Sequence, residues 1–229
     1  MTQEEYFHRQ IQLWGAETQT SLQDKRIAII GAGGLGSSLA LALGTSGIGY
    51  IDIVDFDKVS LHNIHRQIAF TLKDQDKYKA KVVTDLVKSK NPFITIKAIT
   101  TTFEEFSKLE GRYDLIIDST DNLQTRMQID IFAKEQNTPW IYGSVEAWHG
   151  YVCFFENSSF NSFNVSDHKP AGIAAPIVMH IASLQANLAL RYLAGQSVAK
   201  DKLYYLYFNE NGELVTQKFG LPIKKMVKL

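Results

Sequence analysis

Three glycines follow a short run of aliphatic residues near the start of the chain. In IAIIGAGGLG (residues 27–36), Gly31, Gly33 and Gly36 have the spacing G-x-G-x-x-G. In nucleotide-binding proteins this spacing makes a tight strand-to-helix turn, lets backbone approach phosphate, and allows close packing of helix on strand. The following helix offers free N–H groups to an anion, and Asp55 stands where a carboxylate can bond a ribose hydroxyl. These residues predict a nucleotide site, with a purely structural turn as the alternative.

Cationic residues after the second predicted strand help to distinguish ATP from NAD as the nucleotide that would bind. One helix N-terminus largely satisfies the diphosphate of NAD, whereas ATP and its pyrophosphate leaving group also require cations and a metal. Asn63 and Arg66 lie after the second predicted strand, at the edge where open α/β sheets bind ligands. Lys77, Lys79 and Lys81 open a predicted helix, although the helix dipole prefers acids there. Placement for an anion would explain these lysines, and a solvated charged face is the alternative that spacing leaves open.

A group of acids and an amide follows another predicted strand. In DSTDN, the residues Asp118, Asp121 and Asn122 cluster at its carboxyl end. One acid there can cap the next helix, whereas two acids and an amide suggest a site for a hard cation such as magnesium. The residues alone leave the choice between cap and metal open.

The elements that would position these residues alternate between strand and helix. Continuous apolar runs such as residues 27–30 are typical of buried parallel strands. The alternation predicts an α/β fold, a Rossmann-like doubly wound and mostly parallel sheet. The predicted strands are 26–30, 50–54, 94–99, 114–118 and 140–142, and the predicted helices are 34–46, 76–90, 103–108 and 123–135.

The pattern changes in the last third of the chain. Strands are expected at 151–155, 203–208 and 213–218, with a hairpin turn at Asn211-Gly212, so that antiparallel strands extend the sheet. A long helix is expected from Ile173, His149 is expected in a turn, and residues 157–170 are expected to form a mobile loop. The first 24 residues are predicted to be a helical extension of a single domain spanning residues 1–229.

Several motifs together resemble the ThiF/MoeB/HesA branch of the ubiquitin-activating-enzyme superfamily. They are HRQIQLWG, GAGGLGS, DFDKVSLHNIHRQ, DSTDNLQTR and AGIAAPIVMHIASLQANLALRYLAG, spread over residues 4–195. Members use Mg-ATP to adenylate the C-terminal glycine of a ubiquitin-like sulfur-carrier protein. The resemblance implies an adenylyltransferase that activates ThiS of thiamine biosynthesis as an acyl-adenylate and releases pyrophosphate. A MoeB-like enzyme that activates MoaD in molybdopterin synthesis is the alternative, because nothing in the sequence identifies the carrier.

The resemblance also implies roles for individual residues. The residues expected to bind ATP are Gly31, Gly33, Gly34, Gly36, Asp55, Asp57, Asn63, Arg66, Lys79 and Asn122. The residues expected to be catalytic are Arg9, Arg66, Lys79 and Asp121, and Asp121 is also the expected magnesium ligand. In the family, the residue matching Arg9 reaches the ATP site of a second subunit, which implies a homodimer.

Two departures from the family limit what the resemblance implies. The positions of the zinc-binding cysteine pairs of many relatives, near residues 158–163 and in the C-terminal IKKMVKL, contain no cysteine, so no zinc is expected. The place of the cysteine that forms a thioester or persulfide in some relatives is held by about His168. Cys153, within YVCFF, is predicted to be a buried thiol, which argues against a covalent relay.

Composition excludes several other classes of protein. The chain has 229 residues, with 24 Lys plus Arg and 24 Asp plus Glu, so no net charge recruits nucleic acid or membrane. One cysteine excludes an internal disulfide, and the polar N-terminus lacks the apolar core of a signal peptide, which predicts a cytoplasmic protein. An NAD-dependent oxidoreductase and an inactive scaffold subunit are further alternatives, and Arg66, Lys79 and Asp121 argue against both.

Overall fold

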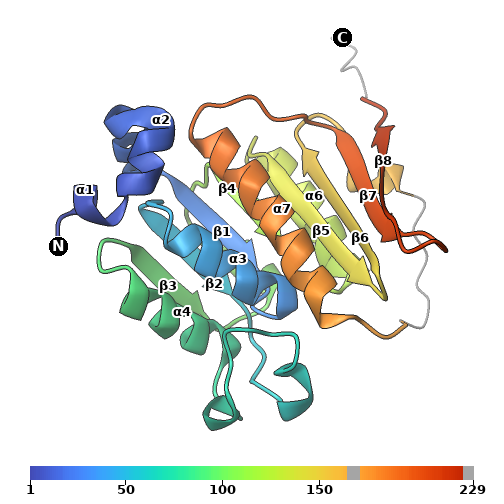
Figure 1. Ribbon diagram of the computed structural model, residues 1–229, viewed down its shortest axis with the longest axis horizontal. Helices are drawn as coiled ribbons and strands as arrows, with labels where there is room; N and C mark the ends of the chain where they lie inside the picture. The colour runs from blue at the N-terminus through green and yellow to red at the C-terminus, as the bar shows by residue number, and fades with distance from the viewer. Residues whose placement is uncertain (164–170, 224–229) are drawn as a thin grey trace.

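A single mixed sheet of eight strands forms the centre of the computed structural model, which describes residues 1–163 and 171–223 (Figure 1). The strand order is β3-β2-β1-β4-β5-β6-β7-β8. The first five strands are parallel: β1 (Arg26–Ile30), β2 (Tyr50–Val54), β3 (Thr95–Ile99), β4 (Leu115–Asp118) and β5 (Trp140–Glu146). The last three are antiparallel: β6 (His149–Phe155), β7 (Lys202–Phe208) and β8 (Leu214–Gly220). The predicted mostly parallel sheet with an antiparallel C-terminal extension is confirmed.

Helices cover both faces of the parallel part of the sheet. One face packs against α3 (Gly34–Gly44), α4 (Lys79–Lys90) and α7 (Ala175–Leu193), and the other against α5 (Phe103–Phe106) and α6 (Leu123–Glu135) (Figure 1). Because β1 and β4 are buried on both faces, their side chains are apolar throughout, apart from the terminal Arg26 and Asp118. No helix among the described residues has the length and apolar character to cross a bilayer.

Short helical elements complete the fold. The N-terminal extension contains α1 (Gln3–Tyr6), α2 (His8–Ser21) and the 3₁₀ turn η1 (Leu22–Asp24), as predicted. Three further 3₁₀ turns lie in loops: η2 (Leu61–Asn63), η3 (Leu72–Asp74) and η4 (Phe160–Ser162).

The chain order of the parallel strands reverses between β1 and β4. Connections on the two sides of this point run to opposite faces, which leaves a crevice at the carboxyl ends of the strands. The glycine turn follows β1 at this crevice. Gly31 has φ +97°, and a Cβ on Gly36 would lie 2.0 Å from the carbonyl oxygen of Gly31. The turn therefore needs glycine for its backbone conformation at the first position and for close packing at the other.

Several predicted boundaries differ from the structure by one to four residues; β5, for example, ends at Glu146 rather than at residue 142. α4 begins at Lys79, three residues later than expected, because Asp76 has φ +64° and Tyr78 pairs with Lys58 in an isolated bridge. A two-residue hairpin at Ala147 and Trp148 joins β5 to β6. His149 is therefore the first residue of β6 rather than part of a turn, and its Nδ1 lies 2.6 Å from the hydroxyl of Tyr205.

Residues 157–163, which we expected to belong to a mobile loop, are fixed against the core. The buried carboxylate of Asp201 accepts hydrogen bonds from the backbone amides of residues 156–158 and, at 2.7 Å, from the Ser158 hydroxyl. Phe160 is buried, and the Ser159 hydroxyl donates to Asp130. The rest of that predicted loop, residues 164–170, lies outside the described residues.

Replacing Asp201 by asparagine is expected to lower the Tm by about 5 °C at pH 7, because charge-assisted bonds to backbone amides are lost. Burial opposes ionisation of Asp201, but the hydrogen bonds from residues 156–158 outweigh it, so the folded pKa is lowered. This stabilisation is complete above the unfolded pKa of about 3.9 and is lost as pH falls through the folded pKa. Thermal melts from pH 7 to pH 3 should show the difference from wild type shrinking below about pH 4.

The matched control is Asp24→Asn, which changes an exposed aspartate and should leave the Tm unchanged. A Tm difference between Asp201→Asn and wild type that stays constant down to pH 3 would contradict the role assigned to the Asp201 charge.

Candidate active site

A cavity of about 1040 Å³ opens at the carboxyl ends of β1, β2 and β4. We call one part of it the glycine arm, which is lined by the glycine turn and by residues 54–57, 66–67, 79, 101–104 and 119–122. We call the other part the tyrosine arm, which is lined by Tyr142, Ser144, Val145, Glu146, Tyr151, Phe163, Ala171, Ile173 and Leu203. The glycine arm is rich in backbone amides and charged groups, whereas the tyrosine arm is largely aromatic and aliphatic.

Asp55 fixes the shape of the glycine turn. Its Oδ2 accepts a hydrogen bond of 2.6 Å from the amide of Ala32, and its Oδ1 accepts one of 2.7 Å from the amide of Asp57. Burial raises the pKa of Asp55, against the lowering effect of the Ala32 amide and the charge of Lys79. The carboxylate thus ties the end of β2 to the glycine turn and still lines the cavity.

Besides Arg126, which also lines the cavity, two cations line the glycine arm, each with a partner. Lys79 Nζ lies 2.7 Å from Asp57 Oδ2, and the lysine side chain is 8% exposed whereas that of the aspartate is 52% exposed. Arg66 Nη2 donates to Asn63 Oδ1 at 3.1 Å. Asn63 is not among the cavity-lining residues, so in this structure it contacts the arginine rather than the cavity. Asp57 and Asn63 therefore hold the charged ends of Lys79 and Arg66 in place beside the glycine turn.

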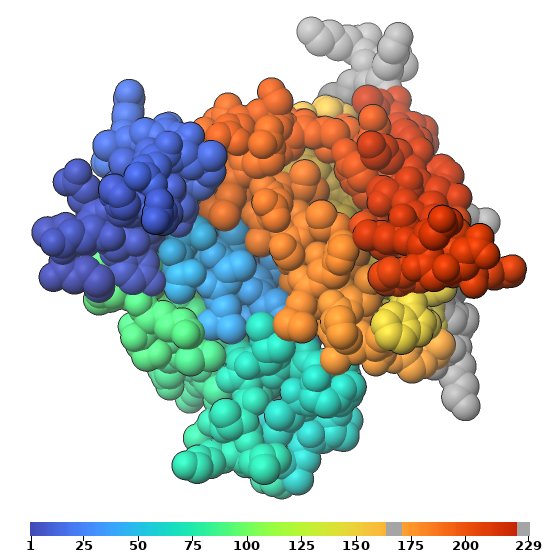
Figure 2. Space-filling model, in the orientation of Figure 1, coloured from blue at the N-terminus to red at the C-terminus, as the bar shows by residue number. Residues whose placement is uncertain are grey.

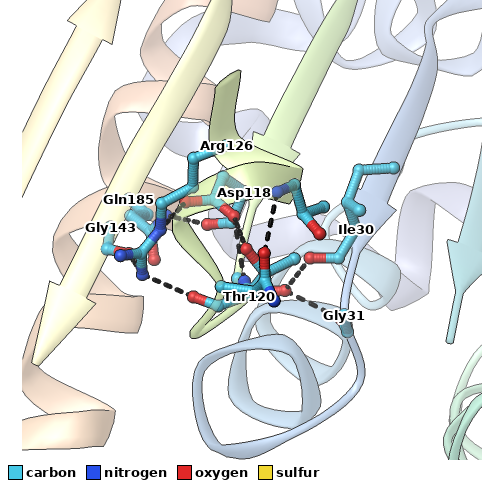
Figure 3. Close-up of polar contacts among 10 residues, drawn as sticks. Ile30, Gly31, Asp118, Thr120, Arg126, Gly143 and Gln185 are labelled. Atoms are coloured by element: carbon cyan, nitrogen blue, oxygen red, sulfur yellow. Dashed lines mark hydrogen bonds and ion pairs between the residues drawn. The ribbon is translucent and has the colours of Figure 1, made fainter. Parts of the chain in front are cut away.

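The turn after β4 is held by buried charges (Figure 3). Asp118 is completely buried, and its Oδ2 lies 3.1 Å from Nε of Arg126, which is 6% exposed. Asp118 Oδ1 accepts hydrogen bonds from the amide and hydroxyl of Thr120, at 2.9 and 2.7 Å. Burial raises the pKa of Asp118, with the charge of Arg126 acting in opposition. The suggestion that Asp118 joins a cation site is thus wrong, because its carboxylate points into the core.

The two neighbouring polar residues have separate places. The Asn122 side chain accepts a hydrogen bond of 2.9 Å from the amide of Thr125, so an amide, rather than an acid, caps α6. Asp121 is exposed and lines the cavity. Among the described residues, no group of three or more His, Cys, Asp and Glu side chains could hold a metal ion. A magnesium ion bound by Asp121 would therefore need phosphate oxygens and water as its other ligands.

Arg9 lies far from the cavity of its own chain. It is exposed on α2, and this extension is bonded to the C-terminal ends of two helices: Gln10 donates to the carbonyl of Ser46, just after α3, and Tyr6 to that of Lys90, the last residue of α4. Figure 2 shows the N-terminal helices at one corner of the molecule, well separated from the segment around residues 60–75. Of the predicted site residues, the cavity lining contains Gly31, Gly33, Gly34, Asp55, Asp57, Arg66, Lys79, Asp121 and Asn122, and does not contain Gly36, Asn63 or Arg9.

Some cavity residues were missed in the sequence. Gln67 is 4% exposed, lines the glycine arm, and has no hydrogen-bond partner for its Oε1. Its position directly after Arg66, in the motif HRQ at residues 65–67, could have indicated that it lies in the cavity. The tyrosine arm had no signal of this kind, because its residues come from three strands and from the connection between η4 and α7.

Cys153 is buried and faces away from solvent, as predicted for a core thiol. Burial raises the pKa of its thiol, which keeps it un-ionised at neutral pH. His168 lies outside the described residues.

Comparison with known proteins places the chain in a family. The profile of the ThiF family matches residues 7–223, nearly the whole chain. The chain belongs to the ThiF family. This confirms the resemblance seen in its motifs.

Relatives within the family differ in the carrier that their names specify. The Escherichia coli sulfur carrier protein ThiS adenylyltransferase is 33% identical over 77% of this chain and 75% of its own length. The Escherichia coli molybdopterin-synthase adenylyltransferase is 30% identical over 82% of each chain. The adenylyltransferase and sulfurtransferase MOCS3 of Caenorhabditis briggsae is 30% identical over 87% of this chain, which spans about half (53%) of that relative.

Solved structures support the fold. Escherichia coli MccB in complex with ATP superimposes with a TM-score of 0.83 at 20% identity, over 99% of this chain and 74% of that one. PaaA gives a TM-score of 0.81 at 23% identity, over 96% of this chain and 75% of its own. At these identities the likeness establishes the architecture.

Proposed function

We propose that this ThiF-family chain is an ATP-dependent adenylyltransferase that activates the C-terminal glycine of a ubiquitin-like sulfur-carrier protein. One observation carries the proposal. A single cavity joins a glycine turn, flanked by Arg66, Lys79 and Asp121, to an arm lined by aromatic and aliphatic side chains. The glycine arm suits a triphosphate, and the tyrosine arm suits an extended peptide tail without charged side chains.

The reaction follows from how this cavity handles charge. A carrier carboxylate oxygen forms a bond to the α-phosphorus of ATP while the α–β phosphoanhydride bond breaks, giving acyl-adenylate and pyrophosphate. The carboxylate is already ionised, so the protein supplies no nucleophile and no base. Arg66 and Lys79 offset the repulsion between the two anions and stabilise the leaving pyrophosphate. The glycine turn and Asp55 orient the nucleotide, so that positioning and electrostatics provide the rate.

The cavity also suits magnesium. When bound, the ion would neutralise developing charge on the phosphates. Asp121 is the exposed carboxylate of the glycine arm closest in sequence to the buried end of β4, and it would hold the ion with phosphate oxygens. Asp57 already pairs with Lys79, so its oxygen keeps the lysine in place.

We further propose a homodimer in which Arg9 completes the site of the neighbouring subunit. Arg9 lies on an extension bonded to the C-terminal ends of α3 and α4, whereas the N-terminal ends of these helices line the cavity, so an action on phosphates requires a second chain. We place the enzyme in the cytoplasm, where ATP is available, and regard residues 1–229 as a single adenylation domain. The preferred carrier is ThiS of thiamine biosynthesis, with MoaD as the alternative, because relatives of both kinds match this chain.

ATP–pyrophosphate exchange with each carrier tests the proposal. Radiolabelled pyrophosphate should enter ATP when the chain is incubated with Mg²⁺ and the ThiS protein of the same organism, and omission of Mg²⁺ should abolish the exchange. The matched control is the same carrier lacking its last glycine, which should give no exchange. Exchange with MoaD alone would reassign the pathway, and exchange with neither carrier would refute the proposed function.

A further inference from the structure

Arg126 stands where the two arms of the cavity meet. Its Nε pairs with Asp118, and its Nη2 donates to the carbonyl of Thr120 at 2.5 Å and to that of Gly143 at 3.3 Å (Figure 3). Thr120 belongs to the turn that carries Asp121 in the glycine arm. Gly143 lies on β5 between Tyr142 and Ser144, both of which line the tyrosine arm. One guanidinium therefore bonds backbone from both arms.

Further contacts make the junction rigid. The Arg126 guanidinium lies 5.1 Å from the centroid of the Tyr142 ring. The Ser119 hydroxyl lies within hydrogen-bond distance of the carbonyls of Ile30 and Gly31, at 2.7 and 2.8 Å. Gln185 of α7 donates to the Asp118 carbonyl at 2.7 Å. The end of β4 is thereby joined to the glycine turn, to β5 and to α7 at once.

Stability alone does not account for a buried pair of charges at this place. Taking both charges out of water costs a large desolvation energy, and apolar replacements of buried ion pairs are often neutral or stabilising. A planar guanidinium, however, has donors in fixed directions and can bond a carboxylate and two carbonyls in one geometry. Lysine or an apolar side chain at this position could not hold three separate acceptors in register.

We infer that Arg126, with Asp118 as its counter-ion, is a positioning residue that sets the turn bearing Asp121 against the strand that begins the tyrosine arm. This inference rests on the proposed function, because that reaction requires the α-phosphate and the carrier carboxylate to meet. Arg126 acts through Thr120 and Gly143, whose carbonyls it holds. A displacement of about 1 Å between the two arms is enough to lower a rate by about 100-fold.

Two variants separate positioning from stability. Arg126→Gln leaves Asp118 buried without a counter-charge, so the Tm should fall by about 10 °C. The rate of carrier-dependent ATP–pyrophosphate exchange should fall by at least about 100-fold. Asp118→Asn combined with Arg126→Gln gives a neutral amide pair, which should restore most of the Tm. Exchange by the double variant should stay about 100-fold below wild type, with the KM for ATP within about threefold.

Arg126→Lys keeps the charge and should retain the Tm while lowering exchange by about tenfold. If the double variant recovered the rate of ATP–pyrophosphate exchange as well as the Tm, the inference would be overturned, because the Asp118–Arg126 pair would then have only a structural role.

Hydrogen exchange provides a readout that does not depend on the carrier. In the double variant without nucleotide, amides of residues 119–122 and 142–145 should both exchange about tenfold faster than in wild type, whereas those of α4 should not change. Unchanged protection of either segment would overturn the inference. Absence of pyrophosphate exchange by the wild-type chain would instead refute the proposed function, and hydrogen exchange would still decide whether Arg126 couples the arms.

Discussion

Asp121→Ala should lower carrier-dependent ATP–pyrophosphate exchange by about 10²–10³-fold, the loss typical when a charged group that stabilises a transition state is removed. Asp121 is exposed in the glycine arm and has no role in the core, so the fold should persist. Without its carboxylate, the proposed magnesium ion loses its protein ligand, and the triphosphate loses its fixed geometry. Initial rates at saturating carrier and varied Mg²⁺ measure the effect.

The magnesium dependence separates a metal ligand from other roles for Asp121. If Asp121 binds the ion, Asp121→Asn should regain part of the rate at high Mg²⁺, because an amide oxygen is a weaker ligand for the same ion. The matched control is Asp85→Ala, which removes an exposed aspartate of α4 that does not line the cavity. Near-normal exchange by Asp121→Ala, with an unchanged far-ultraviolet circular dichroism spectrum, would show the metal assignment to be wrong.

The parallel half of the fold was readable from local sequence. Residues 27–30 and 115–117 are apolar because they are buried on both faces, and the glycines after β1 are required by one positive φ and one close backbone contact. The apolar strands and the glycine turn each depend on a few consecutive residues, so they can be predicted from short stretches of sequence. The carboxyl-end location of Asp55, Arg66, Lys79 and Asp121 then follows from strand direction alone.

What the sequence could not provide depends on tertiary contacts. Asp118 and Asp121 are three residues apart in one polar run, yet one is completely buried and the other is exposed. Asp118 is paired with Arg126 in the first turn of α6, and the motif DSTDNLQTR contains this arginine without showing which acid it faces. The tyrosine arm was missed for the same reason, since its walls meet only when β5, β6 and β7 pair.

Fixed positive charge and a fixed turn together support the proposal that this cavity binds a triphosphate rather than a dinucleotide. Lys79 is almost completely buried beside Asp57, and Arg66 is held by Asn63, so neither side chain must be ordered when the nucleotide binds. Preorganised charges of this kind favour the transition state because little reorganisation is left for the reaction step. Asp57 fixes Lys79 and Asp55 fixes the glycine turn, which accounts for the D-x-D pair after β2.

Arg9→Ala should lower exchange by about 100-fold or more, the effect expected when an arginine supplied from another subunit is removed from phosphoryl chemistry. The far-ultraviolet spectrum and the KM for the carrier should change little, because Arg9 is exposed and its side chain donates a hydrogen bond to Gln12 of the same helix. Arg112→Ala is the matched control, since it removes an exposed arginine that does not line the cavity.

Mixing Arg9→Ala with Asp121→Ala protomers decides which chain the arginine serves. In a mixed dimer, the Arg9→Ala protomer keeps Asp121 and receives Arg9 from its partner, so one of the two sites is complete. Equal amounts and random pairing should restore about a quarter of wild-type exchange, because half of the dimers are mixed and each has one complete site. If Arg9 acts within its own chain, neither protomer can form a complete site. No recovery, with mixed dimers demonstrated by co-purification of two different tags, would therefore contradict a shared site.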